Sequence, residues 1–92
     1  MGIDTDDLTN KTYNAIIVEA EKFDDNLTLQ FGLLSYDSND ERDFIHNCER
    51  LIHKMLKYNE DEMDDMFFGE PPTKESFHKA LNKLLANIAT LK

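Results

Sequence analysis

The sequence contains three histidines and one cysteine, the side chains that most often bind transition metals. His46, Glu49 and His53 are three and four residues apart, so in a helix they share one face. At about 100° per residue, that face points about 150° away from the apolar positions of the same segment. A di-iron centre between helices needs Glu-x-x-His on two helices, directed into the core. Here the pattern is His-x-x-Glu, it occurs once, and its side chains are expected to point to solvent. We therefore expect no metal and no cofactor.

Cys48 and His78 are predicted to be packing residues. Cys48 occupies an apolar position of its helix, whereas a cysteine nucleophile needs solvent access and a lowered pKa. A single cysteine cannot form an internal disulfide, which favours a reducing compartment, so we expect a cytoplasmic protein. His78 borders the apolar face of the last predicted helix.

Carboxylates are abundant, but their spacing matches no calcium loop. The segment that begins at Asp37 starts like an EF-hand loop, yet Arg42 replaces its glycine and Cys48 replaces its final glutamate. The three glycines are isolated, which excludes a glycine-rich phosphate loop, and no serine lies in a nucleophile elbow. We therefore expect a protein that is not an enzyme.

The charge of the chain limits its partners. The net charge of −9 repels nucleic acids and anionic membranes, so neither is expected as a partner. Residues 1–72 hold 18 acids and 6 bases, a net of −12, whereas residues 73–92 hold 1 acid and 4 bases, a net of +3. The longest uninterrupted apolar run, residues 15–18, is too short to span a membrane. A mildly basic last helix is thus expected to lie against an acidic body.

Helical spacing of the apolar residues predicts four main helices in one domain, residues 1–92. The last helix has the clearest pattern, with apolar residues in steps of four and three. Residues 15–18 are also compatible with a strand, and so are residues 27–36, where leucine and phenylalanine alternate with polar residues. The good helix-forming residues around residues 15–18 favour a helix there. No second convincing strand is evident to pair with residues 27–36, which favours a helix there too. The predicted helices are residues 4–23, 27–36, 39–58 and 73–91.

Capping residues place the helix boundaries. Ser38 and Glu41 have the spacing of a capping box, in which each side chain bonds the backbone N–H of the other residue. Gly69 is expected to end a short extra helix, and the prolines at 71–72 to force an extended connection to Thr73. The predicted fold class is therefore all-α: a compact antiparallel four-helix bundle with a short extra helix before the final helix.

The segment 60–72 combines acids, large apolar residues and two prolines. In one interpretation its aromatic residues close an end of the bundle as a hydrophobic plug. In the other they form an exposed anchor for a partner protein, next to an acidic run. The candidate partner-binding residues are Glu60, Asp61, Asp64, Asp65, Phe67 and Phe68.

Two functional hypotheses follow, although no motif in the sequence assigns a function. The first is a non-enzymatic interaction or structural module, which forms a homodimer or binds a protein partner. The alternative is an acidic inhibitor, similar to an antitoxin, that occupies a basic site on its partner. A third possibility, a small enzyme or metal carrier, has no supporting motif. In overall character the chain resembles many small bacterial proteins.

Overall fold

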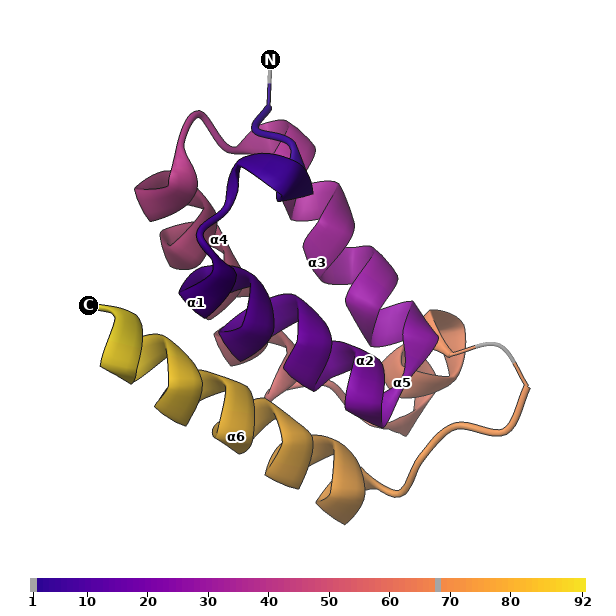
Figure 1. Ribbon diagram of the computed structural model, residues 1–92. Helices are drawn as coiled ribbons and strands as arrows, with labels where there is room; N and C mark the ends of the chain where they lie inside the picture. The colour runs from indigo at the N-terminus through magenta and orange to yellow at the C-terminus, as the bar shows by residue number, and fades with distance from the viewer. Residues whose placement is uncertain (1, 68) are drawn as a thin grey trace.

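A computed structural model describes residues 2–67 and 69–92, and this part of the chain is helical with no β-strand. The predicted all-α class is confirmed. The Cα radius of gyration of 12.6 Å is close to the roughly 12 Å expected for a compact chain of this length. In chain order (Figure 1), the elements are η1 (Thr5–Asp7), α1 (Asn10–Tyr13), η2 (Asn14–Val18), α2 (Glu19–Phe23), α3 (Asp25–Asp37), α4 (Glu41–Met55), α5 (Glu60–Met66) and α6 (Lys74–Leu91).

The first helix begins later than predicted. The acidic start forms only the single 3-10 turn η1, and the backbone of Leu8 and Thr9 is extended. Thr9 then caps the helix, because its Oγ1 accepts a hydrogen bond from the backbone N–H of Thr12 (3.2 Å). The backbone N–H of Thr9 donates in turn to Glu41 of α4 (2.6 Å). The expected start at residue 4 was wrong because Thr9, not the acidic residues, supplies the cap.

From Asn10 to Phe23 the chain is one continuous helix, α1, η2 and α2, in which the middle segment is π-helical. The alternative of a strand at residues 15–18 was therefore wrong. A π-helical turn holds more residues than an α-helical turn and widens the helix locally. Both Ile16 and Ile17 are buried, and η2 packs against α3 and α6.

Residues 27–36 are helical, as predicted, within α3. Asp24 is the N-cap of the helix, because its Oδ1 accepts from the backbone N–H of Asn26 (2.7 Å). Leu27 and Phe31 are fully buried on its inner side. In Figure 1, α3 runs back along α2, against which it packs.

The boundaries of α4 differ from the prediction. Asp40, not Ser38, is the N-cap, because its side chain accepts from the backbone N–H of Asp43 (2.8 Å). Ser38 is buried, where its hydroxyl donates to the Leu34 carbonyl (2.8 Å) and accepts from Asn47 (3.0 Å). The predicted capping box was therefore wrong. The helix ends at Met55 rather than near residue 58, and a turn leads into α5.

The short extra helix is confirmed as α5. Its start is a capping box that the sequence analysis did not identify: Asn59 and Glu62 each accept a hydrogen bond from the other's backbone N–H (2.9 and 3.2 Å). The helix ends at Met66 before it reaches Gly69, which has a positive φ of 82°. Thr73 caps α6 as predicted, with Oγ1 accepting from the N–H of Ser76 (3.1 Å).

The apolar face of α6 is the clearest part of the core. The apolar residues in steps of four and three are Phe77, Leu81, Leu84 and Ile88, which are buried, and Leu91, which is partly buried. The helix packs against α4, η2 and α2. It also contacts α1 and thus packs against four elements along its length, which explains why its apolar repeat is so regular.

Candidate functional site

The predicted acidic residues lie together on α5. Glu60, Asp61, Asp64 and Asp65 are exposed, while Met63 of the same helix is buried in the core. Glu60 and Asp61 are in the first helical turn, where negative side chains interact favourably with the free backbone N–H groups. These two acids therefore stabilise the start of the helix. Together with Asp64 and Asp65 they form an acidic surface.

Phe67 does not belong to that surface. Only 4% of the residue is exposed, and its ring meets those of Phe23 and Phe77 edge to face, with centroids 6.4 and 5.4 Å apart. Such pairs are favourable arrangements of aromatic rings. The position closes the core as a plug, so the expectation of an exposed partner anchor at Phe67 was wrong. The other candidate aromatic residue, Phe68, lies outside the described residues.

The histidine face of α4 is exposed, as predicted. His46 and His53 face solvent on either side of Glu49, and Glu49 accepts a hydrogen bond from Lys92 Nζ (2.6 Å). This bond holds the pKa of Glu49 below its ordinary value. Within the described residues, no group of three or more histidine, cysteine or acidic side chains has a metal-binding arrangement.

Cys48 is fully buried, which confirms its packing role. Burial raises the pKa of the Cys48 thiol because the thiolate would lose its hydration. A thiol in this state is a weak nucleophile.

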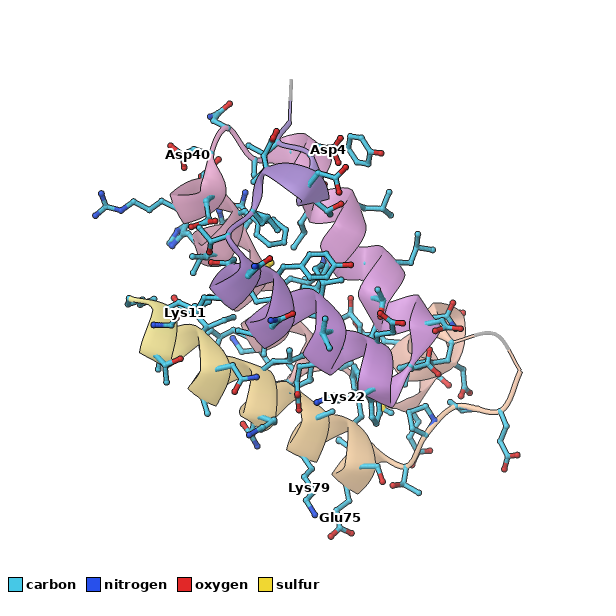
Figure 2. The ribbon with its side chains drawn as sticks, in the orientation of Figure 1. Asp4, Lys11, Lys22, Asp40, Glu75 and Lys79 are labelled. Atoms are coloured by element: carbon cyan, nitrogen blue, oxygen red, sulfur yellow. The ribbon has the colours of Figure 1, made fainter. Side chains whose placement is uncertain are left out.

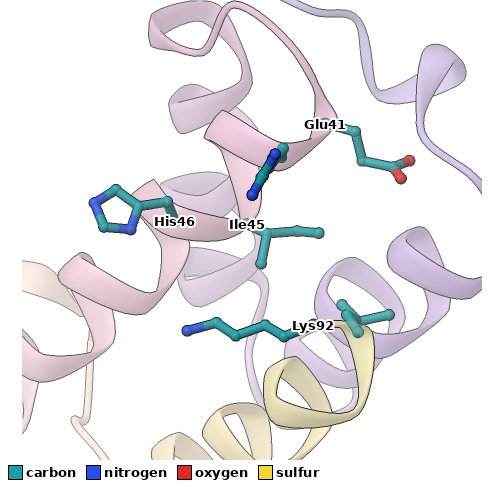
Figure 3. A pocket seen from close by; sticks show the side chains of 6 residues that line it. Glu41, Ile45, His46 and Lys92 are labelled. Atoms are coloured by element: carbon teal, nitrogen blue, oxygen red, sulfur yellow. The ribbon is translucent and has the colours of Figure 1, made fainter.

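A surface hollow of about 590 Å³ lies between the N-terminal part of α4 and the C-terminal end of α6 (Figure 3). In Figure 3, His46 and Glu41 point in different directions, with Ile45 between them. Two of the charged groups here already take part in the fold, because Glu41 accepts from the Thr9 backbone and Lys92 donates to Glu49. The hollow is lined by Glu41, Arg42, Ile45, His46, Leu91 and Lys92.

The most unusual surface of the described structure lies on α3, and the sequence analysis did not identify it. Leu29, Leu33 and Tyr36 are 54%, 50% and 73% exposed and are the large apolar side chains on the exterior. Their spacing of four and three residues aligns them along one side of α3. Buried Leu27 and Phe31 lie on the opposite side. We name Leu29, Leu33 and Tyr36 the α3 stripe.

Acidic groups surround the α3 stripe. Asp25 lies one turn before Leu29, and Asp37 directly follows Tyr36. The N-terminal segment is bound beside the end of α3 by a hydrogen bond from the Ile3 N–H to the Ser38 carbonyl (3.0 Å), and Figure 2 shows Asp4 there. On one flank, Gln30 of α3 lines a hollow together with Asp65 of α5. The acidic surface of α5 thus continues toward the stripe.

No known protein family matches this chain. Neither the curated proteins nor the solved structures show a significant similarity to it. Among the described residues, no helix combines the length and apolarity that a membrane span requires.

Proposed function

We propose that this protein is a non-enzymatic interaction module, formed by a small antiparallel bundle, whose partner-binding surface is the α3 stripe. One observation supports the proposal: α3 is apolar on its exposed side as well as on its buried side. A helix that is apolar all round is normally covered all round. Contiguous exposed apolar surface on a small soluble domain is typical of a protein-binding site.

The stripe has the geometry of a helical recognition surface. Anchors at positions i, i+4 and i+7 are the pattern that one helix presents to a groove or to a second helix. Each leucine is about half exposed, so its full burial by a partner would contribute about 1 kcal/mol to the free energy of binding. Tyr36 adds a large ring with few rotatable bonds, a residue type that is common at interface hot spots.

The test compares the wild-type chain with the double variant Leu29→Ser/Leu33→Ser in affinity purification from native extract and in sedimentation. We expect the variant to keep its fold, because both side chains are exposed, and to lose the specific partner. The matched control, Asn82→Ser/Ala86→Ser, changes two exposed positions of α6 with the same spacing and should retain the partner. A strictly monomeric wild type that recovers no specific partner would contradict the proposal, as would equal recovery by all three chains.

A second candidate function is an acidic inhibitor that occupies a basic site of an enzyme. The exposed carboxylates of α5 favour it, because five acids on one short helix create a strong local negative potential. The triple variant Asp61→Lys/Asp64→Lys/Asp65→Lys should then abolish a binding that is strongly dependent on salt. Unchanged partner binding by this variant would exclude α5 as the contact. In either function we place the protein in a reducing compartment such as the cytoplasm, because its one cysteine has no partner for an internal disulfide.

A further inference from the structure

We infer that the occupant of the α3 stripe is a basic amphipathic helix of a partner protein, rather than a second copy of this chain. The inference rests on the proposed function, because it names the chemistry of the partner that the same surface binds. Two observations support it: the charges around the stripe and the shape of α3.

The shape of α3 suits a helix laid along it. Leu29 and Tyr36 are seven residues apart, which corresponds to about 10 Å, or two helical turns. Gly32 lies between Leu29 and Tyr36 on that side of the helix, and a Cβ atom placed there would have no neighbour within 4 Å. The glycine therefore leaves a shallow notch between two large side chains. Small residues at such positions allow a second helix to approach closely.

The charged residues of α3 and of the loops on either side of it have one sign. Residues 23–41 contain five acids and no lysine or arginine. The next base before this segment, Lys22, belongs to α2 and already pairs with Glu19 (3.6 Å). Asp25 lies at one end of the stripe, and Asp37 at the other. A complementary partner therefore carries apolar residues in its centre and lysine or arginine around them.

The same charges oppose self-association. Each copy has a net charge of −9, so a dimer would hold −18. In an antiparallel pairing of two α3 helices, Asp25 of one copy approaches Asp37 of the other, and in a parallel pairing each acid approaches its own equivalent. Like charges at an interface cost affinity, and at low salt they are poorly screened. Neither arrangement removes the repulsion, whereas a basic partner converts it into attraction.

The experiment titrates the full-length chain with two labelled synthetic peptides and follows fluorescence anisotropy. Both are 18-residue amidated helices of leucine and alanine with one apolar face; the polar face is lysine in one and glutamate in the other. We expect the lysine peptide to bind at least tenfold more tightly than the glutamate peptide. The affinity of the lysine peptide should fall about tenfold between 0.05 and 0.5 M salt, because the charges of Asp25 and Asp37 are then screened.

Three variants separate specific binding from general attraction to an acidic protein. Leu29→Ser/Leu33→Ser should abolish binding of the lysine peptide. Asp25→Asn/Asp37→Asn should weaken it at least threefold. The matched control, Glu70→Gln/Glu75→Gln, removes the same charge from exposed positions elsewhere and should leave the affinity unchanged. In Figure 2, Glu75 lies at the far end of the molecule from Asp4.

The outcomes distinguish this inference from the proposed function. If the lysine peptide binds the leucine variant as well as it binds wild type, the attraction is general and the inference is overturned. It is also overturned if sedimentation shows a wild-type dimer that Leu29→Ser/Leu33→Ser dissociates, although the stripe then remains an interaction surface. If neither peptide binds while the native partner still depends on the leucines, the partner chemistry is wrong and the proposed function stands.

Discussion

The side-chain amide of Asn87 donates a hydrogen bond to the backbone carbonyl of Ala15, with Nδ2 and O 3.0 Å apart. The bond joins α6 to the π-helical turn η2, across 72 residues of sequence. Widened turns of this kind displace carbonyl groups from the regular helical ladder, where side-chain donors can reach them. Asn87 therefore fixes the irregular part of the first helix against the most regular helix of the protein.

Replacing Asn87 with alanine should lower the free energy of unfolding by about 1 kcal/mol, because a partly buried hydrogen bond is lost. Alanine also favours helices more than asparagine does, by about 0.5 kcal/mol, which hides part of the loss. The control Asn82→Ala has the same propensity gain at an exposed position of α6. Urea unfolding followed by circular dichroism should thus give a lower free energy of unfolding for Asn87→Ala than for Asn82→Ala. Equal stabilities would show that the bond to Ala15 contributes nothing.

Replacing Phe67 with alanine (Phe67→Ala) should lower the free energy of unfolding by about 3 to 4 kcal/mol, since it leaves a cavity between Phe23 and Phe77. The matched comparison is Tyr36→Ala, which truncates an aromatic ring that is 73% exposed and should change stability by about 0.5 kcal/mol or less. Thermal unfolding of the two variants measures the difference. If Phe67→Ala were as mild as Tyr36→Ala, the ring would not be part of the core.

The helices and most of the core could be predicted from the sequence because they depend on periodicity. The repeat from Phe77 to Ile88 identifies the buried face of α6 without reference to any other element. The helix boundaries were harder, because several polar residues compete for each cap. Ser38 has the right spacing for a capping box, yet its hydroxyl is buried with Leu34 and Asn47, and Asp40 is left to cap α4. That choice depends on contacts between elements.

The α3 stripe was overlooked for a related reason. Leucine and phenylalanine alternate at residues 27–31 because α3 is apolar on opposite sides, and the same alternation is the signature of a strand. The sequence alone does not indicate which side faces the core. Leu29, Leu33 and Tyr36 have helical spacing, which was a usable signal, but their exposure follows from how α2 and α4 pack against α3. The acidic residues of α5, in contrast, were expected on the surface from their charge alone.

Cys48 should react with a thiol reagent such as Ellman's reagent only when the fold opens. Its side chain is fully buried and burial raises its pKa, so both access and thiolate formation are suppressed. We expect native protein to react at least about a hundredfold more slowly than protein unfolded in guanidinium chloride. A chain with Cys48→Ala and His46→Cys moves the thiol to an exposed position of α4 and should react rapidly without denaturant. Equal rates for the two native chains would contradict the burial.

The pair Glu49–Lys92 predicts a small dependence of stability on pH. Lys92 Nζ donates to the Glu49 carboxylate and lowers its pKa in the folded state below the ordinary value of 4.5. The ionised carboxylate therefore favours folding. The contribution is present above the unfolded-state pKa and is lost as the pH falls through the lower folded-state pKa. Because the pair is exposed, salt should weaken it.

A carbon-detected NMR titration of Glu49 measures this interaction directly. In Lys92→Ala the pKa of Glu49 should rise toward 4.5, although His46 and His53 also lower it and remain present. Lys83→Ala removes an exposed lysine from the same helix and is the control that should leave the titration unchanged. A Glu49 pKa that is the same in wild type and Lys92→Ala would mean that the pair does not form in solution.

Gly32→Ala should stabilise the protein by about 0.5 to 1 kcal/mol. Glycine inside a helix costs conformational entropy relative to alanine. Apart from its chain neighbours and the backbone of its own helix, a Cβ atom at Gly32 would meet no atom within 4 Å. Gly69 is the matched contrast, because its φ of 82° lies in a region that disfavours side chains with a Cβ atom. Gly69→Ala should therefore destabilise the protein, and urea unfolding of both variants should give shifts of opposite sign. If Gly32→Ala were also destabilising, the space beside the α3 stripe would be filled in solution by another part of the molecule or by a second copy.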